Sequence, residues 1–186
     1  LLDGENLAAL PMYRISQKVG SVFQNPRTQF FNVDTDSEIA FGLENEAVPE
    51  QRMRALVTET AAALHIENLL GRNIFALSGG EKQKIAFASV YAMAPDVYLL
   101  DEPSSNLDMA AIEALREHLL QIKAQGKTIL IAEHRLYYLM DVADRILYLE
   151  NGKITGDWTP RAFRAIPPKT RQEMGLRTLD LTEETP

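Results

Sequence analysis

Two acidic residues, Asp101 and Glu102, directly follow the apolar run DVYLL at 96–100. An unbroken apolar run of this length is typical of a strand buried on both faces of a parallel sheet, and ligands bind at the carboxyl ends of such strands. A carboxylate there can organise Mg²⁺ for nucleoside-triphosphate hydrolysis, and its neighbour can polarise a water for attack on the terminal phosphate. The structural alternative is that both acids cap the next element, although two idle acids beside a buried strand are costly.

Two other predicted strands end in side chains that suit the same chemistry. His134 follows the apolar run TILIA, and Gln24 ends the segment VGSVFQ. A histidine at a strand end can bridge a γ-phosphate and the attacking water, and a glutamine can contact the metal ion or the water. Read alone, each residue is more often structural than functional.

The segment ALSGGEKQKIAFAS at 76–89 predicts a helix whose first turn has an unusual composition. Ser78 and Glu81 have the spacing of a capping box. Gly79 and Gly80 do not fit that interpretation, because glycine in the first turn costs helix stability relative to alanine. Glycines here let another body approach the backbone, and free N–H groups at a helix N-terminus form a seat for a phosphate.

The segment QGKT at 125–128 imitates the end of a phosphate-binding loop, G-x-x-x-x-G-K-[ST]. The position five before Gly126 is Gln121, and the order helix, glycine, strand is the reverse of a phosphate loop. Gly126 is therefore interpreted as a helix C-cap. The sequence contains no other candidate for a phosphate-cradling loop.

The predicted elements place three helices ahead of an α/β core with parallel strands, which indicates a helical insertion. Helical periodicity predicts helices at about 36–45, from Pro49 through RALVTETAAALH, at 78–93 and at 109–126. Strands are predicted at 19–24, 96–100 and 127–134, each of the last two as a buried strand, followed by a hairpin that turns at Asn151-Gly152. The proline-containing segment after Thr159 is expected to be a linker or a loosely packed extension.

Composition is that of a globular protein and argues against several classes. The 186 residues are 46% hydrophobic and 24% charged, with a net charge of −7 and scattered basic residues, so nucleic acid is not the expected main partner. The absence of cysteine excludes disulfides and thiolate metal sites. No apolar run is long enough to span a membrane and no signal peptide opens the chain. The first methionine is Met12, which favours an internal piece of a longer protein.

Five segments, VFQNP, LSGGEKQ, YLLDEP, SSNLD and AEHR, occur in the order and spacing of ATP-binding-cassette (ABC) ATPases. The chain resembles that family from about Leu1 to Thr159. The resemblance implies a P-loop NTPase (RecA-like) α/β core with a parallel sheet and an inserted helical subdomain. It divides the chain into core segments 1–24 and 94–158, a helical subdomain 25–93 with the signature motif, and an extension or linker 159–186.

Within the family, the segments FQNPRTQFF…EIAFGLEN and AEHRLYYLMDVADRILYLENGKI look like the ATPase subunits of energy-coupling factor importers. Those proteins drive uptake of vitamins and transition-metal ions. The resemblance implies ATP and Mg²⁺ as cofactors and a location at the cytoplasmic face of the membrane. It implies a second cassette, identical or different, and transmembrane subunits as partners.

The resemblance also assigns a role to each matched strand-end residue. Gln24 is the Q-loop glutamine near ATP and Mg²⁺, and Asp101 is the Walker B aspartate that organises Mg²⁺. Glu102 is the general base or water-orienting carboxylate, and His134 is the switch histidine. The Walker A loop lies upstream of Leu1 by the same likeness, so the chain is expected to be a truncated ATPase that holds ATP poorly by itself.

The remaining matched residues face the other half of a dimer by this likeness. In this family two cassettes meet head to tail, and each ATP lies between one Walker A and B set and the signature helix of the other cassette. The residues assigned to such contacts are Ser78, Gly79, Gly80 and Glu81 of the signature and Asp108 of the D-loop.

Three alternatives have distinguishing features. SMC and Rad50 ATPases insert a long coiled coil between Q-loop and signature, whereas about fifty residues without sustained heptads stand here. A translation-associated cassette normally carries two cassettes and a charged linker. A docking module without hydrolysis would have no use for Glu102 and His134. The sequence leaves open the transported substrate and the choice among homodimer, heterodimer and tandem fusion.

Overall fold

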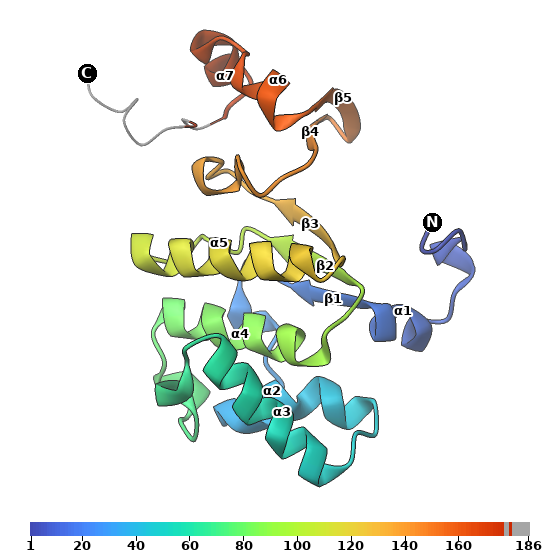
Figure 1. Cartoon of the computed structure of the whole chain (residues 1–186), viewed down its shortest axis with the longest axis vertical. Helices are drawn as coiled ribbons and strands as arrows, with labels where there is room; N and C mark the ends of the chain where they lie inside the picture. Colours follow the sequence, from blue (N-terminus) through green and yellow to red (C-terminus); the bar gives the residue numbers. More distant parts are fainter. Residues whose placement is uncertain (177–178, 180–186) are drawn as a thin grey trace.

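Three parallel strands form the central sheet of the computed structural model, which describes residues 1–176 and 179 (Figure 1). They are β1 (Val19–Val22), β2 (Val97–Asp101) and β3 (Thr128–Ala132), in the spatial order β1-β2-β3. All three predicted strands are therefore confirmed, together with the parallel α/β class. Parallel pairing needs a crossover between strands, and here the crossovers contain the helices that cover the sheet.

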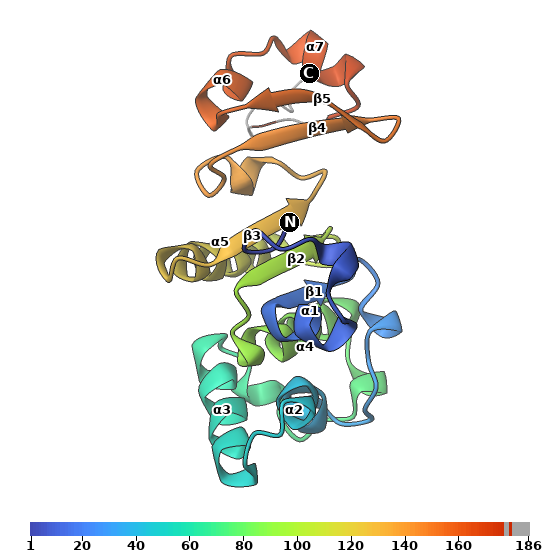
Figure 2. The same cartoon turned by 90° about the vertical axis from the view of Figure 1, so that its right-hand side faces the viewer.

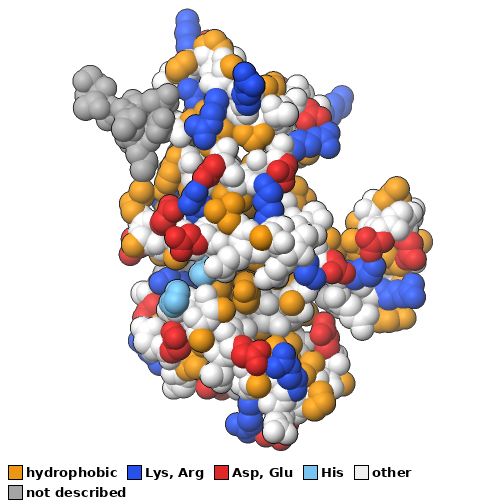
Figure 3. Space-filling model, viewed as in Figure 1, with side chains coloured by type: hydrophobic (Ala, Val, Ile, Leu, Met, Phe, Trp, Pro, Cys, Tyr) orange, Lys and Arg blue, Asp and Glu red, His pale blue; other side chains and the backbone are white. Residues whose placement is uncertain are grey.

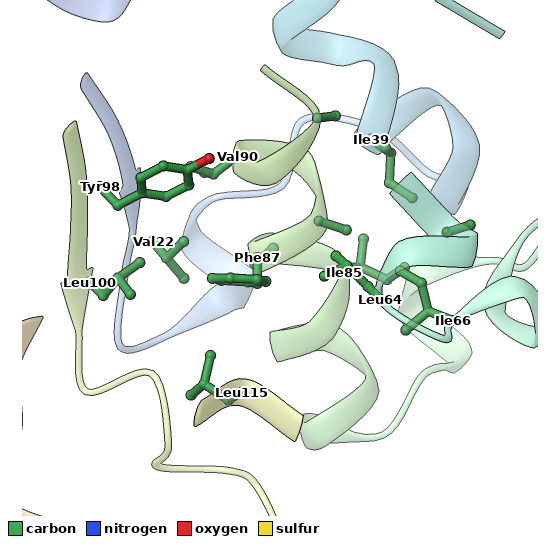
Figure 4. Close-up of a cluster of buried hydrophobic side chains, with 14 of the residues drawn as sticks. Val22, Ile39, Leu64, Ile66, Ile85, Phe87, Val90, Tyr98, Leu100 and Leu115 are labelled. Atoms are coloured by element: carbon green, nitrogen blue, oxygen red, sulfur yellow. The ribbon is translucent and has the colours of Figure 1, made fainter. Parts of the chain in front are cut away.

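Helices α4 (Gly79–Met93) and α5 (Met109–Ala124) bury the apolar face of this sheet. The buried side chains of Val22, Tyr98 and Leu100 point from the strands toward Phe87 and Val90 of α4 (Figure 4). Leu115 and other residues of α5 belong to the same cluster. Burial of large apolar side chains of this kind contributes about 1.5–3 kcal/mol each, so this cluster holds the strands and both helices together.

A helical layer lies on the side of α4 away from the sheet. It contains α2 (Thr35–Asn45) and α3 (Glu50–Ala63), and Figures 1 and 2 show both helices below α4. The Asp34 carboxylate caps α2 by accepting a 2.9 Å hydrogen bond from the Ser37 N–H, which lowers the pKa of Asp34. Because α4 packs on both the sheet and this layer, the boundary of the helical subdomain at residue 93 stays a prediction.

A second, antiparallel sheet lies beyond β3, at the end of the molecule away from α2 and α3 (Figure 2). It consists of β4 (Ile146–Glu150) and β5 (Lys153–Trp158), and the predicted turn is confirmed, since Asn151 and Gly152 both have positive φ. The hairpin strands pair with each other rather than with β3.

The segment after Thr159 is not loosely packed where the structure describes it, which corrects the sequence-based expectation. Residues Pro160–Arg164 form α6 and Pro168–Glu173 form α7. Phe163 is 1% exposed, and its ring centroid lies 5.6 Å from that of Trp158. This aromatic contact holds α6 to the hairpin. Residues 177–178 and 180–186 of the predicted extension lie outside the described residues.

The prediction that β3 is buried on both faces is wrong. Leu130 is 59% exposed, and Thr128 and Ala132 on the same face are exposed too. The reason is that α4 and α5 cover one face of the sheet, and within the described residues no element covers Leu130. An apolar run therefore marked the strand correctly but did not report its surroundings.

The N-terminal residues and the connections contain shorter helices. Helix α1 (Met12–Lys18) leads directly into β1, and an ion pair joins Lys18 to Asp3. Single 3₁₀ turns are η1 (Leu7–Ala9), η2 (Pro26–Thr28), η3 (Glu67–Leu69), η4 (Ile74–Ala76) and η5 (Tyr137–Leu139). Among the described residues, no helix has the length and apolar character that crossing a membrane would require.

A glycine at the junction of β1 and α4 provides a test of this packing. A Cβ atom at Gly20 would lie 2.4 Å from Val90 Cγ1 and 2.9 Å from Pro95 Cγ. We expect Gly20→Ala to lower the free energy of unfolding by about 1–3 kcal/mol through overpacking, measured by urea denaturation. Gly42→Ala is the matched control, because it meets the flexible Met93 side chain and should cost less. Equal stability of the Gly20→Ala variant and the parent would contradict the packing described here.

Candidate functional site

The parallel register brings the predicted strand-end residues to one edge of the sheet. Val22 pairs with Leu100, and Asp101 pairs with Ala132, so all three strands end at about the same level. Residues just beyond these ends are therefore neighbours in space although they are far apart in sequence. The edge receives Gln24, the pair Asp101–Glu102 and His134.

Glu102 lies at the centre of this edge and contacts both of the other predicted residues. The Gln24 amide nitrogen donates a 2.8 Å hydrogen bond to Glu102 Oε2. On the other side, His134 Nε2 lies 3.2 Å from Glu102 Oε1. The structure thus joins glutamine, glutamate and histidine from the ends of three strands into one connected group. Such a group can hold a water and accept its proton.

The backbone at Glu102 adopts the left-handed conformation, with φ of 42°. This conformation costs a non-glycine residue about 1–3 kcal/mol and collects at functional sites. It is held by two backbone hydrogen bonds: the Glu102 N–H donates to Ala132 O at 2.9 Å, and Glu102 O accepts from the Ser105 N–H at 3.1 Å. The sequence does not reveal this left-handed conformation of Glu102.

Asp101 and Gln24 have the donor types that fit Mg²⁺. The Asp101 carboxylate is exposed and has no hydrogen-bond or ion-pair partner among the described residues. Gln24 uses its amide nitrogen on Glu102, which leaves its amide oxygen available to a cation. Mg²⁺ keeps several waters and needs only one or two protein oxygens, so this pair suffices; no cluster of three or more potential ligands occurs in the described part of the chain.

The tip of α4 is the second predicted part of the site, and it is open to solvent. Ser78 is exposed and caps the helix by accepting a 3.3 Å hydrogen bond from the Glu81 N–H. In return Glu81 Oε2 accepts a 2.8 Å bond from the Ser78 N–H, which completes the predicted capping box. Glu81 Oε1 binds Arg72 Nη1 at 2.8 Å. Both carboxylate oxygens of Glu81 are thus used to build the helix start, while Ser78 is an exposed residue.

The two glycines at this tip differ in what requires them. A Cβ atom at Gly80 would lie 3.0 Å from the backbone oxygen of Asn106 in the same chain. A Cβ atom at Gly79 would meet only the Asn106 side chain, at 3.7 Å or more. The approaching body at Gly80 is therefore the chain's own loop 103–108, whereas nothing among the described residues requires a glycine at 79.

Asp108 has a clear structural role in this geometry. Its carboxylate caps α5 by accepting a 2.8 Å hydrogen bond from the Ala111 N–H. The resemblance assigned Asp108 to nucleotide contacts, and that role stays a prediction. This bond anchors the end of loop 103–108 to α5. The same loop lies close to the α4 tip, because the Asn106 backbone oxygen would be 3.0 Å from a Cβ atom at Gly80.

Sequence reasoning missed a partly buried network beside the site. Glu133, which precedes His134, accepts hydrogen bonds from the Ser104 and Tyr138 hydroxyls at 2.7 and 2.9 Å. Ser104 is fully buried and Tyr138 is 2% exposed. A carboxylate beside a strand-end histidine was the available signal in AEHR.

A cavity of about 120 Å³ lies between α4 and α5, and apolar side chains line it together with His65, Gln83, Lys84 and His118. None of the predicted site residues lines it. The Gln83 amide is buried without a hydrogen-bond partner among the described residues, and the cavity has room for water, the ordinary partner of such a group. Burial lowers the pKa of His118, which favours its neutral form. This cavity is separate from the candidate site.

The capping box predicts a pH dependence of stability. Hydrogen bonds from Ser78 and from Arg72 lower the pKa of Glu81 from its ordinary 4.5 to about 2. A depressed pKa in the folded state stabilises the fold above pH 4.5, and this contribution is lost as the pH falls from 4.5 to 2. We expect the unfolding free energy of the parent to fall more steeply over this range than that of Glu81→Gln, by urea denaturation at several pH values. Glu117→Gln, on the exposed face of α5, serves as control; equal slopes for parent and Glu81→Gln would contradict the prediction.

Comparison with known proteins gives a consistent result. The family profile described as ABC transporter matches residues 1–105. A Treponema denticola protein provisionally named as an ABC transporter ATP-binding protein is 52% identical over 183 residues, 98% of this chain and 37% of that protein. The energy-coupling factor transporter ATP-binding protein EcfA of Methanothermobacter thermautotrophicus is 33% identical over 97% of this chain and 60% of its own length. The chain thus spans between about a third and two thirds of these relatives' length.

Solved structures agree on the fold. CbiO1 of Clostridium perfringens, described as part of the ABC transporter complex CbiONQ, matches with a TM-score of 0.74 and 28% identity, over 87% of this chain and 64% of that one. A dimeric ATP-binding cassette, MJ0796, described in a post-hydrolysis state bound to ADP and Pi, matches with a TM-score of 0.77 over 86% of this chain and 72% of that one. At 22% identity the second likeness shows the fold alone. The predicted cassette fold is confirmed.

Proposed function

The chain belongs to the ABC transporter family of ATP-binding proteins, and from this premise we propose that it is the part of an ATPase subunit that cleaves ATP to power an importer. The observation that carries the proposal is the meeting of Gln24, Glu102 and His134 at the carboxyl edge of the sheet. Each residue alone is unremarkable. A site that activates water needs such a convergence of polar groups on one carboxylate. The strained backbone of Glu102 is a further feature that is common at functional sites.

Each residue of the edge has a proposed task. Glu102 accepts the proton of the attacking water or orients that water. His134 and Gln24 both contact Glu102 and lie where they can sense the γ-phosphate. Asp101 and the Gln24 amide oxygen hold Mg²⁺ through its water shell, and the ion supplies charge neutralisation for the phosphates.

The tip of α4 is proposed to serve the nucleotide of a second cassette. Ser78 and Gly79 at this tip are exposed, so a second chain can reach them. The tip is also a different part of the chain from the strand ends that carry Glu102 and its neighbours. The Gly79 backbone and Ser78 Oγ offer hydrogen-bond donors, and the dipole of the fifteen-residue helix favours an anion. Binding of a phosphate at a helix N-terminus does not require basic side chains. On the face shown in Figure 3 the Lys and Arg side chains are interspersed with acidic ones and form no basic patch.

The finer proposal is an importer of the energy-coupling factor type, acting at the cytoplasmic face of the membrane. Its support is the likeness to EcfA and to CbiO1, whose description places it in a transporter complex. The partners would be a second cassette, identical or different, and transmembrane subunits that contact the helical layer. Binding of ATP would close the two cassettes and hydrolysis would release them.

Reconstitution tests this proposal. The full-length protein, purified with its co-expressed membrane partners, is placed in liposomes, and uptake of candidate vitamins and transition-metal ions is measured with ATP on the cassette side. Uptake that depends on hydrolysable ATP and Mg²⁺ supports the importer. ATP turnover without a membrane partner would favour a cassette unrelated to transport, and ATP-independent partner binding would favour a docking module.

A further inference from the structure

Glu133 is the most heavily hydrogen-bonded carboxylate beside the candidate site. Its Oε1 accepts from the backbone N–H of His134 at 2.8 Å and of Arg135 at 3.1 Å. Its Oε2 accepts from Ser104 Oγ at 2.7 Å and from Tyr138 OH at 2.9 Å. Four donors point at one carboxylate, and an ionised carboxylate is the side chain that accepts at both oxygens at once.

Three of the four donors come from two loops that both belong to the candidate site, and the fourth, Tyr138, belongs to η5. His134 and Arg135 follow β3, whereas Ser104 lies two residues after Glu102. A second link runs alongside: Arg135 Nη1 donates to Ser104 O at 3.2 Å and to Leu107 O at 3.4 Å. Loop 103–108 and the start of the His134 loop are therefore tied together through charged groups.

The surroundings of Glu133 make these bonds costly to lose. Ser104 and Tyr138 are almost completely buried, so neither hydroxyl can turn to bulk water instead. Burial and the charge of Glu133 raise the pKa of Tyr138, which keeps its hydroxyl protonated and donating. Hydrogen bonds from two buried hydroxyls to one partly buried carboxylate therefore favour a single arrangement of these groups.

We propose that Glu133 is a positioning residue that holds His134 in contact with Glu102 and joins the His134 loop to loop 103–108. The inference rests on the proposed ATPase function. Because loop 103–108 ends at the Asp108 cap of α5 and its Asn106 touches Gly80 of the α4 tip, Glu133 links the two predicted parts of the site.

Kinetics of the full-length protein test the inference. Glu133→Ala is expected to lower kcat by about 10- to 100-fold while changing the KM for ATP by less than about twofold, because misplacing a reacting group costs rate more than binding. Glu133→Gln should recover most of kcat, since its amide oxygen can accept both backbone N–H bonds and its nitrogen can donate to the two hydroxyls. Equal loss in both variants, or a parental kcat in Glu133→Ala, would overturn the inference.

A double-mutant cycle with His134→Ala separates positioning from general damage. If Glu133 acts through His134, then Glu133→Ala adds less than about threefold in single-turnover rate when His134 is already alanine. Multiplicative losses would overturn the inference. A parent that turns over no ATP would instead refute the proposed function, and the next measurement then decides the inference alone.

Neighbouring tyrosines supply a matched pair and a measurement that does not need turnover. Tyr138→Phe removes one donor to Glu133, whereas the Tyr137 hydroxyl contacts Met109 Sδ at 3.3 Å and lies outside the network. We expect Tyr138→Phe, and not Tyr137→Phe, to accelerate amide hydrogen exchange of His134 and Arg135 several-fold, as seen by NMR. Unchanged exchange in Tyr138→Phe would overturn the inference even where Glu133→Ala fails to fold.

Discussion

Glu102→Gln is expected to lower ATP turnover of the full-length protein by about 10²- to 10⁴-fold, the range that a positioned general base contributes. The glutamine keeps the size of the side chain, and its amide oxygen can still accept the 2.8 Å bond from Gln24. What it loses is the ability to take a proton at neutral pH. Binding of ATP should therefore continue while the chemical step stops.

The same variant is expected to accumulate as an ATP-bound dimer, because closure needs ATP and release needs hydrolysis. Light scattering coupled to size-exclusion chromatography, with ATP and Mg²⁺ present, measures this directly. Glu117→Gln on α5 removes an exposed carboxylate away from the sheet edge and should behave like the parent. A Glu102→Gln protein that hydrolyses ATP near the parental rate would exclude Glu102 as the base.

Gly79→Asp is expected to have the second large effect. A carboxylate at this position would stand where the proposed phosphate binds, and two unit charges about 4 Å apart repel by about 4 kcal/mol at an effective dielectric of 20, or roughly 10³-fold in binding. The helix dipole stabilises an acidic residue in the first turn, so the free energy of unfolding should not fall. Loss of activity with unchanged thermal stability is the expected combination.

Gly79→Ala is the matched control for this experiment, because among the described residues outside its own helix turn the new Cβ would meet only the Asn106 side chain, at 3.7 Å or more. Since no described residue crowds this Cβ, we attribute any loss of activity in Gly79→Ala to a body outside the chain, and we expect it to be much smaller than the loss in Gly79→Asp. Gly80→Ala is unsuitable, since the Asn106 backbone lies 3.0 Å from the new atom. ATP turnover and ATP-induced dimerisation of the full-length variants are the measurements. Parental values in Gly79→Asp would show that the α4 tip faces no anion.

Local signals in the sequence predicted the helices and strands well. Ser78 and Glu81 predicted the start of α4, and Asn151-Gly152 predicted the hairpin turn, because each structure depends on residues that are neighbours along the chain. The parallel class followed from strands that alternate with helices. Burial of β3 was not predictable in this way, since an apolar run does not tell which of its faces another element will cover.

The candidate site shows the same division. Residue type and position after a strand selected Gln24, Asp101, Glu102 and His134, because acids, amides and imidazoles at such ends are what phosphate chemistry uses. The sequence could not show that Gln24 and His134 both reach Glu102. Both contacts depend on the parallel register, which pairs Val22 of β1 with Leu100 of β2 and Asp101 of β2 with Ala132 of β3, residues that are far apart along the chain.

The sequence by itself therefore determined the cassette class, the helix starts and the types of side chain at each strand end, since these depend on short-range spacing and periodicity. Only the tertiary structure decided that Gly80 accommodates the chain's own Asn106, that Asp108 caps α5, and that Glu133 joins two loops. The physical reason is that hydrogen bonds and close contacts between distant segments exist only after the sheet has set their register. A pattern of residue types carries no information on which carboxylate will meet which donor.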